Sequence, residues 1–251
     1  MRLETIAATT ADLLKGELHD PMPADLAAAV RSIADSLTVP GSAPSAFEVR
    51  NAMRKLNSLR RFEHARTVGG AWRDTRGCDP TIQKYYAQAM IELGALDAAD
   101  ALLSEALEAG VRSTDVQFTV ELPEYRGLRG RIRKQRFVDT GALSFLSAAT
   151  DEYAAQYSAR KSYWHGINIV ALRTKEEEDG LPPRSGETTI ELAEQVLEIA
   201  LAEHAKSSAD SWPLATASEA FLALHGNGRG SALGEMAELW LYRFLNHPNP
   251  P

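Results

Sequence analysis

The stretch Asp79–Val111, DPTIQKYYAQAMIELGALDAADALLSEALEAGV, decides the fold of this chain. No helix-breaking residue lies between Pro80 and Leu93, and Gly94 follows at a position where a helix can end in a left-handed conformation. After that turn, apolar residues recur at steps of three and four and therefore share one face of a second helix: Ala98, Ala99, Leu102, Leu103, Ala106 and Leu107. The stretch predicts two helices folded back on each other, in which the small residues Ala99 and Ala106 let the backbones approach closely.

The order of residues in this hairpin resembles a tetratricopeptide repeat (TPR), a helical hairpin with a period of about 34 residues. The resemblance rests on Tyr86-Ala87, the turn residue Gly94, then Ala99, Leu103 and the pair Ala106-Leu107. A unit one period upstream begins at Ala46, and its packing positions hold Ala52, Leu56, Phe62, Ala65 and Trp72. Arg60 stands where the usual turn has glycine, so this copy matches the repeat less well.

Periodicity and turn residues divide the chain into three parts. Residues 1–39 predict an N-terminal helical cap of two amphipathic helices around the turn Asp20–Pro23, and a linker follows to residue 45. Residues 46–246 predict a TPR-like repeat domain of about five helix pairs, and residues 247–251 predict a linker or tail. The expected fold class is all-α, a superhelix of TPR-like helical hairpins with an N-terminal cap.

Arg112–Pro123 does not fit the repeat phase. Val116, Phe118, Val120 and Leu122 alternate with polar residues, which favours an extended or looped insertion that packs on the helices. The helix pairs expected after it are Tyr125–Phe137 with Leu143–Tyr157, Tyr163–Thr174 with Thr189–His204, and Ser211–Leu224 with Ser231–Asn246. Between Tyr163–Thr174 and Thr189–His204, the two helices of one pair, Lys175–Glu187 is charged and rich in proline and glycine, so we expect a solvated loop.

Composition places the chain among ordinary soluble proteins. Of its 251 residues 44% are hydrophobic and 24% charged, and the longest apolar runs, such as Ile167–Leu172, are far too short to span a membrane. The formal net charge of -7 argues against general nucleic-acid binding. With one cysteine, Cys78, the sequence predicts no internal disulfide and no cysteine-based zinc site, and a reducing cytoplasm is the simplest location.

No motif in the sequence predicts catalysis, a cofactor or a metal site. The six histidines are scattered without a pair at ligand spacing, and no serine lies in a G-x-S-x-G motif. The glycine-rich run Gly226–Gly230 links two predicted helices and does not follow a strand, so we interpret it as a turn and not as a phosphate loop. Cys78 has no obvious base beside it in the sequence.

Cationic side chains recur on the first helix of successive pairs, the helix that lines the inner face of a TPR-like stack. Residues three or four apart on such a helix point the same way, and these positions hold Arg50 and Arg54, then Lys84 and Gln88, then Arg131 and Lys134. They predict a groove for an anion, either the phosphates of a nucleotide or the carboxylates of a peptide. The alternative is that they are solvated charges or partners of acidic groups on neighbouring helices.

His165 and Asn168 complete the set of candidate ligand-binding residues. Asparagine is a poor helix former, so Asn168 either bonds to a neighbouring turn or faces a ligand. Trp164 is expected to pack under the preceding hairpin. Trp212 and Glu219 are interpreted as structural.

Three motifs carry a narrower resemblance across Ala46–Leu245: GLRGRI at Gly127–Ile132, YWHGIN at Tyr163–Asn168 and SWPLATASEAFLALHG at Ser211–Gly226. Together they resemble the TPR-like TRAF-binding region of the apoptosis signal-regulating MAP kinase kinase kinases and its bacterial relatives, the TPR-type sensor domains of conflict systems. The resemblance implies a non-enzymatic regulatory module. It also implies an effector as partner, because similar bacterial domains accompany proteases and nucleotide-signalling components.

Two functional hypotheses follow. In the first, the inner groove binds an anionic small ligand, such as a nucleotide- or NAD-derived signal, and regulates an attached or associated effector protein in bacterial defence signalling. In the second, the chain is an adaptor that binds a peptide or partner protein in the groove. Neither hypothesis involves a nucleic acid or a membrane. A ligand pocket should be enclosed, whereas a peptide groove should stay open at both ends.

Overall fold

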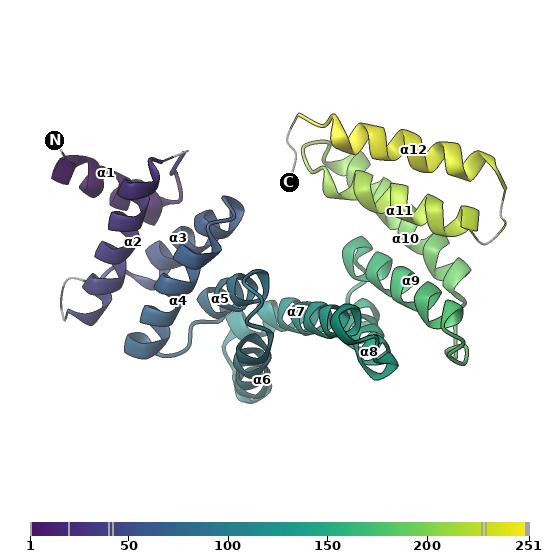
Figure 1. Ribbon diagram of the computed structural model, residues 1–251, viewed down its shortest axis with the longest axis horizontal. Helices are drawn as coiled ribbons and strands as arrows, with labels where there is room; N and C mark the ends of the chain where they lie inside the picture. Colours follow the sequence, from purple (N-terminus) through teal and green to yellow (C-terminus); the bar gives the residue numbers. More distant parts are fainter. Residues whose placement is uncertain are drawn as a thin grey trace. The chain divides into compact units, whose positions relative to one another are not determined.

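The computed structural model describes residues 2–19, 21–39, 41, 43–226, 228 and 230–248. This part of the chain is all-α and contains no strand; its helices are α1 (Arg2–Lys15), α2 (Pro23–Thr38), α3 (Ala46–Ser58), α4 (Phe62–Arg76), α5 (Pro80–Glu92), α6 (Leu96–Arg112), α7 (Val116–Thr140), α8 (Leu143–Ala159), α9 (Tyr163–Glu178), α10 (Thr189–Lys206), α11 (Trp212–Gly226) and α12 (Ala232–Leu245) (Figure 1). From α3 onward they follow one another as TPR-like hairpins, which confirms the predicted fold class.

The chain divides into two compact units, residues 1–128 (unit 1) and 129–251 (unit 2), and the division falls within α7. Each unit has its own hydrophobic core. None of the helices in the described ranges is long and apolar enough to cross a membrane.

The hairpin of α5 and α6 forms where the sequence predicts it. Asp79 caps α5, because its Oδ1 accepts a hydrogen bond from the backbone N–H of Ile82 at 3.0 Å, and Pro80 occupies the first turn of the helix. Gly94 has a φ of 76°, the left-handed conformation expected of a residue that ends a helix. On α6 the predicted packing residues Ala99 and Ala106 are buried, and α6 packs against α5.

The weaker repeat copy, α3 with α4, also has a capped first helix, a left-handed residue in the turn and buried packing positions, but different residues provide them. Ser45 and Glu48 form a capping box at the start of α3: Ser45 Oγ accepts from Glu48 N at 3.3 Å and Glu48 Oε2 accepts from Ser45 N at 2.8 Å. Arg60 takes the left-handed conformation of the missing glycine, with a φ of 55°, at a cost of about 1 kcal/mol. Most of the predicted packing positions are buried: Ala52, Leu56, Ala65 and Trp72.

Gly69 on α4 lets α5 approach closely. A Cβ atom added at Gly69 would lie 2.7 Å from Cγ of Tyr86, whereas at the neighbouring Gly70 the nearest atom, the Tyr86 hydroxyl oxygen, would be 3.6 Å away. The Tyr86 ring therefore lies directly over the backbone of Gly69, and this contact joins the first repeat pair to the second.

Helices α1 and α2 pack on the first repeat pair. Helix α1 contacts α2 and α3, and α2 contacts α4. Their apolar residues belong to the same core as the repeats: Leu13, Leu26, Val30, Ile33 and Leu37. Asp20 of the predicted turn and Pro40 and Ser42 of the predicted linker lie outside the described residues.

The prediction of an extended or looped insertion at Arg112–Pro123 is wrong. Helix α6 continues to Arg112, and α7 begins at Val116 and runs through Pro123. Phe118 and Tyr125, seven residues apart, are buried, whereas Val116 and Val120, four apart, are exposed. The apparent period of two arose because the apolar residues are divided between two faces of one helix. The helix expected to start at Tyr125 therefore starts nine residues earlier. Tyr125 itself is fully buried, and its hydroxyl donates to the carbonyl oxygen of Pro80 at 2.7 Å.

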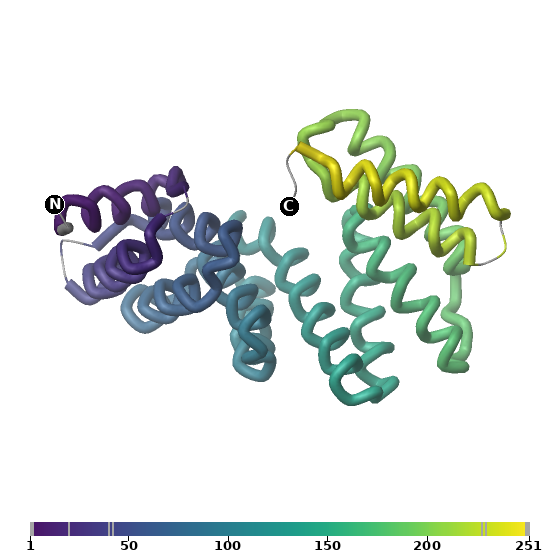
Figure 2. Tube along the Cα trace, turned by 45° about the horizontal axis from the view of Figure 1, so that its top comes forward, coloured from purple at the N-terminus to yellow at the C-terminus, as the bar shows by residue number. Residues whose placement is uncertain are grey.

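In unit 2 each helix packs on the next. Helix α8 contacts α9, α9 contacts α10 and α11, and α11 runs beside α12 (Figure 2). Two glycines of the sequence motifs permit the close contacts. A Cβ atom at Gly130 would lie 2.8 Å from Cε2 of Tyr153, and one at Gly166 would lie 2.3 Å from Cγ2 of Val196. Gly130 thus holds α7 against α8, and Gly166 holds α9 against α10.

The segment Lys175–Glu187 is only in part the solvated loop that its composition predicts: residues 179–187 form a mostly exposed connection, but the residues before them are helical. Helix α9 extends to Glu178, and Glu176 is only 5% exposed. Arg184, from the connection after α9, donates to both carboxylate oxygens of Glu176 at 2.7 and 2.8 Å and to the carbonyl oxygen of Ser147 at 3.1 Å. The connection folds back over α8 and α9 because a buried carboxylate requires a cation beside it.

The glycine-rich turn and the tail are described in part. Helix α11 ends at Gly226, and a ring nitrogen of His225 pairs with the carbonyl oxygen of Gly230 at 3.0 Å. Asn227 and Arg229 of the predicted turn lie outside the described residues, as do residues 249–251 of the predicted tail.

Candidate functional site

The leading helices of unit 1, which are α3, α5 and the first part of α7, are joined by a chain of polar side chains. Arg50 on α3 donates from Nε to both carboxylate oxygens of Asp79 at 3.1 Å, and from Nη2 to Asp79 Oδ2 at 2.6 Å. The same Nη2 donates to Gln117 Oε1 on α7 at 2.6 Å. The hydrogen bonds to Asp79 raise the pKa of the Arg50 guanidinium, so they favour its charged form.

This chain of hydrogen bonds continues to a second cation. Gln117 Nε2 donates to Thr81 Oγ1 at 2.9 Å, and the Thr81 hydroxyl donates to Glu121 Oε1 at 2.8 Å. The Lys84 ammonium pairs with Glu121 Oε2 at 2.7 Å. Asp79, Thr81 and Glu121 are buried. Each of the two cations is therefore offset by one carboxylate inside a preformed network, which we call the unit 1 network.

Two of the predicted ligand-binding cations, Arg50 and Lys84, are thus engaged within the protein. The pairing corresponds to the alternative in which such charges are partners of acidic groups on neighbouring helices. Arg54 lies one turn after Arg50 and is exposed, and Gln88 lies one turn after Lys84 and is half-buried. Anion binding by these four residues stays a prediction, and an anion would have to compete with Asp79 and Glu121 for Arg50 and Lys84.

The leading helices of unit 2 bring three of the predicted residues together. Lys134 on α7 donates from its ammonium to Asn168 Oδ1 on α9 at 3.0 Å, and Asn168 Nδ2 donates to the carbonyl oxygen of Trp164 at 2.9 Å. Asn168 therefore makes the bond to its own helix and also presents its amide oxygen to a neighbouring helix. Arg131 lies one turn before Lys134 on α7, and its positive charge acts on Lys134. We call Arg131, Lys134 and Asn168 the α7/α9 cluster.

Lys134 is a cation in unfavourable surroundings. Burial, followed by the charge of Arg131, lowers the pKa of Lys134, and the charge of Glu219 on α11 acts in the opposite direction. Burial raises the pKa of Glu219, and the charge of Lys134 lowers it. Across the described ranges no carboxylate forms an ion pair with Lys134, whose one hydrogen-bond partner is a neutral amide. An anion placed here would stabilise the ammonium.

His165, the remaining predicted ligand residue, lies in the core. It is 6% exposed, and neither ring nitrogen has a hydrogen-bond partner among the described groups. Trp164 packs edge-on against Tyr153 of α8 with ring centroids 5.8 Å apart, which confirms its predicted place under the preceding hairpin. Burial, followed by the charge of Arg160, lowers the pKa of His165 to about 4. In this state His165 packs as a neutral ring, and its contact with a ligand stays a prediction.

A groove with a volume of about 550 Å³ lies between α9 and α11 in unit 2. Its apolar lining residues are Ile167, Val170, Ala171, Leu222 and Ala223. Its charged lining residues are Glu177, Glu178 and Glu219, and none of the described residues that line it is basic. We call this surface the α9/α11 groove. It is apolar and acidic, and none of the predicted ligand-binding residues lines it.

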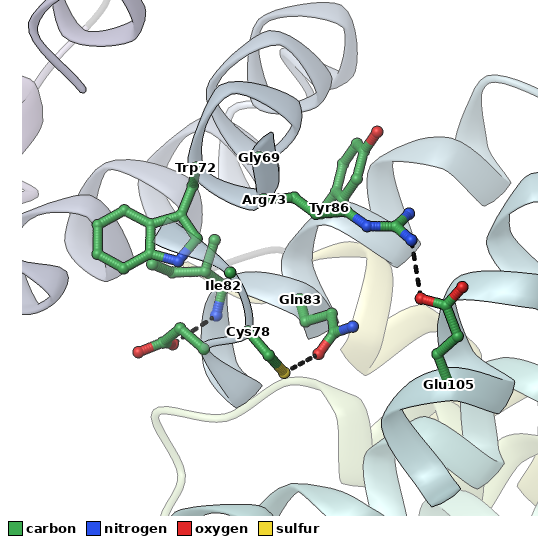
Figure 3. A pocket seen from close by; sticks show the side chains of 10 residues that line it. Gly69, Trp72, Arg73, Cys78, Ile82, Gln83, Tyr86 and Glu105 are labelled. Carbon is green, nitrogen blue, oxygen red and sulfur yellow. Dashed lines mark hydrogen bonds and ion pairs between the residues drawn. The ribbon is translucent and has the colours of Figure 1, made fainter. Parts of the chain in front are cut away.

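A smaller cavity, of about 210 Å³, lies in unit 1 among α4, α5 and α6 (Figure 3). Figure 3 shows Trp72 on one side of it, the Arg73–Glu105 ion pair of 2.7 Å on another, and the Cys78 thiol donating to Gln83 Oε1 at 2.7 Å. Burial, followed by the charge of Asp79, raises the pKa of the Cys78 thiol. The thiol is therefore protonated and a poor nucleophile.

Among the described residues, no group of three or more histidine, cysteine, aspartate or glutamate side chains is arranged to hold a metal ion. In the unit 1 network, Asp79 and Glu121 are partners of cations, and in unit 2 the carboxylates of Glu177, Glu178 and Glu219 line the α9/α11 groove.

The unit 1 network and the α9/α11 groove were not predicted, although the spacing of their residues in the sequence is consistent with both. Gln117 and Glu121 are four residues apart and so share a helix face, but this spacing was hidden by the interpretation of their segment as extended. On α11 the groove residues Glu219, Leu222, Ala223 and Gly226 follow the helical steps of three, four and seven. The sequence interpretation gave Glu219 a structural role, and the structure shows its carboxylate in the groove lining.

Residues 49–173 match the model of a family described as Tetratricopeptide Repeats-Sensor. The matched segment runs from α3 into α9 and contains every predicted ligand-binding residue. No curated protein and no solved structure matches the chain. The family match supports a TPR-like sensor domain, a type of repeat domain that is generally non-catalytic. The narrower relation to the kinase TRAF-binding region stays a prediction.

Proposed function

We propose that this chain is a non-enzymatic sensor module in which the α7/α9 cluster binds the anionic group of a small ligand. The observation that carries the proposal is the environment of the Lys134 ammonium. It is half-buried, its pKa is lowered by burial and by Arg131, and its hydrogen bond of 3.0 Å goes to the neutral amide of Asn168. A cation held in this way is stabilised strongly by an incoming phosphate or carboxylate, because charge-assisted hydrogen bonds replace neutral ones.

The predicted binding surface covered three helix pairs, and we assign the anion to the α7/α9 cluster alone. In the unit 1 network, Asp79 and Glu121 already offset the charges of Arg50 and Lys84. An anion there must displace a buried carboxylate, which then loses its own partner. At Lys134 no such displacement is needed, because the ammonium has no carboxylate partner among the described residues.

Nucleotide- and NAD-derived compounds are the ligand class that this cluster fits best. Their phosphates suit the two cations Arg131 and Lys134, and the Asn168 amide can pair with a hydroxyl or a base edge. Because Lys134 and Asn168 lie on different helices, a ligand that bridges them changes how α7 packs on α9. Such a change, passed to an attached or associated effector such as a protease, would make the chain a sensor in bacterial defence signalling.

A thermal-shift screen of the purified protein tests the proposal. The probes are ATP, NAD, ADP-ribose and inorganic pyrophosphate, and the variant is Lys134→Met, which removes the charge and keeps the bulk of the side chain. The matched control is Arg54→Met, which removes an exposed cation of unit 1. We expect at least one probe to raise the melting temperature of the native protein and of Arg54→Met but not of Lys134→Met. A screen without any shift, or a shift that persists in Lys134→Met, contradicts the proposal.

The second hypothesis, an adaptor, is favoured by one observation, the apolar α9/α11 groove. An adaptor requires a surface that can bury side chains of a partner, and the groove offers several apolar residues beside acidic ones. The two functions use different side chains of unit 2, although the charge of Glu219 in the groove acts on Lys134 of the α7/α9 cluster.

A further inference from the structure

The α9/α11 groove has the dimensions of a helix-binding surface. Its α9 side runs from Ile167 to Glu178, a distance of about 17 Å at a rise of about 1.5 Å per residue. That is about three turns of helix. On the α11 side Leu222 is 60% exposed, although the residues before and after it, Phe221 and Ala223, are buried or half-buried. The large apolar side chain of Leu222 is therefore exposed to solvent at the edge of the groove, where a bound partner could cover it.

The charged side chains that line the groove are all acidic. Glu177 accepts a hydrogen bond from the Thr189 hydroxyl at 2.6 Å, and Glu178 lies 3.5 Å from the Lys175 ammonium, which is closer to Asp179 at 2.8 Å. Glu219 has no ion-pair partner among the described residues, and burial raises its pKa. The carboxylates therefore retain most of their capacity to accept hydrogen bonds from a cation.

We infer that the α9/α11 groove is the docking site for an amphipathic helix of a partner protein, with leucine-sized side chains on its inner face and lysine or arginine on both flanks. The apolar residues of the groove take the inner face, and Glu177, Glu178 and Glu219 take the flanking cations. Both walls of the groove are helices, and a third helix laid along them packs by the same ridges and grooves as the repeats themselves.

The acidic lining of the groove disfavours two other occupants, an anionic small ligand and a fully apolar helix. The anionic ligand proposed for the α7/α9 cluster would meet like charge here, which disfavours binding. A fully apolar helix would dehydrate the carboxylates of Glu177, Glu178 and Glu219 without offering them a cation, which is costly. The inference rests on the adaptor hypothesis and goes beyond the sensor function. The groove and the α7/α9 cluster are formed by different side chains, although the charge of Glu219 acts on Lys134.

Fluorescence anisotropy with a designed peptide tests the inference. The probe is a labelled helix of about 15 residues, long enough to cover the groove, with leucines on one face and lysines on both flanks. The control peptide has the same leucines and glutamates in place of the lysines. We expect the native chain to bind the lysine peptide and to bind the glutamate peptide at least tenfold more weakly.

Two substitutions locate the binding. Leu222→Ser removes the exposed leucine of the groove, and its matched control, Leu239→Ser, removes an exposed leucine of α12 outside the groove. We expect Leu222→Ser to weaken binding of the lysine peptide at least tenfold and Leu239→Ser to leave it unchanged. A second variant, Glu177→Gln with Glu178→Gln and Glu219→Gln, should have an effect of similar size. Circular dichroism confirms that each variant is folded.

Three outcomes overturn the inference. They are the absence of binding by the native chain, equal binding of the lysine and glutamate peptides, and equal binding by Leu222→Ser and Leu239→Ser. The last outcome would mean that the peptide binds another surface of the chain. The thermal shifts of the α7/α9 cluster are measured with different probes and a different variant, so failure of one proposal is distinguishable from failure of the other.

Discussion

The Asp79 carboxylate binds two helices at once: its Oδ1 caps α5 through the N–H of Ile82 at 3.0 Å, while both of its oxygens accept hydrogen bonds from Arg50 Nε on α3 at 3.1 Å. One side chain therefore fixes where α5 begins and how α3 lies against it. Arg50, selected from the sequence as a ligand-binding cation, has this structural partner 29 residues away along the chain.

Substitution of Asp79 separates the two roles. Asp79→Asn keeps a good capping residue but removes the ion pair with half-buried Arg50, and we expect a loss of about 2 kcal/mol in the free energy of unfolding. Asp79→Ala also removes the cap and should cost about 1 kcal/mol more. Urea unfolding measures both. The control is Glu105→Gln, which breaks the exposed ion pair with Arg73 and should cost less than about 0.5 kcal/mol. Equal losses for Asp79→Asn and Glu105→Gln would show that the unit 1 network contributes no more than a surface pair.

Two adjacent glycines of α4 should respond to alanine in opposite directions. Gly69→Ala places a Cβ 2.7 Å from the Tyr86 ring and should destabilise the protein by about 1 to 3 kcal/mol through overpacking. Gly70→Ala meets its nearest atom at 3.6 Å and should stabilise the helix by about 0.5 to 1 kcal/mol, because alanine loses less backbone entropy. Thermal unfolding of the two variants distinguishes them. If both variants unfold at the same temperature, Tyr86 does not lie over Gly69 in solution.

Acid should destabilise unit 2 through His165. Burial lowers the pKa of His165 in the folded state to about 4, below the usual value of about 6.5 that applies when the chain is unfolded. Between these two values the unfolded chain binds a proton that the folded chain does not, so stability falls as the pH falls. The expected loss between pH 7 and pH 5 is about 2 kcal/mol.

The comparison of the native protein with His165→Phe isolates this contribution. Phenylalanine does not titrate, so the variant should lose less stability between pH 7 and pH 5 than the native protein does, when both are measured by urea unfolding. The same slope in both proteins would mean that His165 is solvated in the folded state.

Removal of Arg184 should reverse the pH dependence of Glu176. Burial alone raises the pKa of Glu176, but the hydrogen bonds and charge of Arg184 outweigh burial and hold that pKa below its usual value. In the native protein the contribution of Glu176 is therefore present above about pH 4.5 and lost as the pH falls through its folded pKa. In Arg184→Met burial dominates, so the buried carboxylate should cost about 2 to 3 kcal/mol at pH 7 and less at pH 4.5.

Urea unfolding of Arg184→Met at the two pH values measures this effect. The control is Lys175→Met, which removes a cation from solvent-accessible pairs at the end of α9 and should leave stability nearly unchanged. If Arg184→Met is as stable as Lys175→Met at both pH values, the connection after α9 is not fastened by Arg184.

Local signals explain why most of the fold was predictable. The start of α5 is encoded by Asp79-Pro80 and its end by Gly94, and the buried face of α6 is encoded by its periodic alanines and leucines. The start of α7 was not predictable in the same way. Val116 and Val120 are exposed apolar residues, so they disturbed the helical period that Phe118 and Tyr125 follow.

The binding surface was predictable only in part, because a helix face can be inferred from spacing but a partner across helices cannot. The sequence placed Arg131 and Lys134 on one face of a leading helix and proposed Asn168 as a second contact, and the structure joins Lys134 to Asn168 across 34 residues. The spacing of residues along one helix could not predict that Glu121 on α7 pairs with Lys84 on α5. The α9/α11 groove requires two helices, so neither Leu222 nor Glu177 predicts it alone.

The most direct test of the sensor proposal is the dissociation constant of the anionic probe that gives the largest thermal shift, measured by isothermal titration calorimetry on the native chain, Lys134→Met and Arg54→Met. We predict that Lys134→Met weakens binding at least tenfold, a loss of about 1.4 kcal/mol or more, and that Arg54→Met matches the native chain. Equal affinity in the native chain and in Lys134→Met would contradict the assignment of the ligand to the α7/α9 cluster.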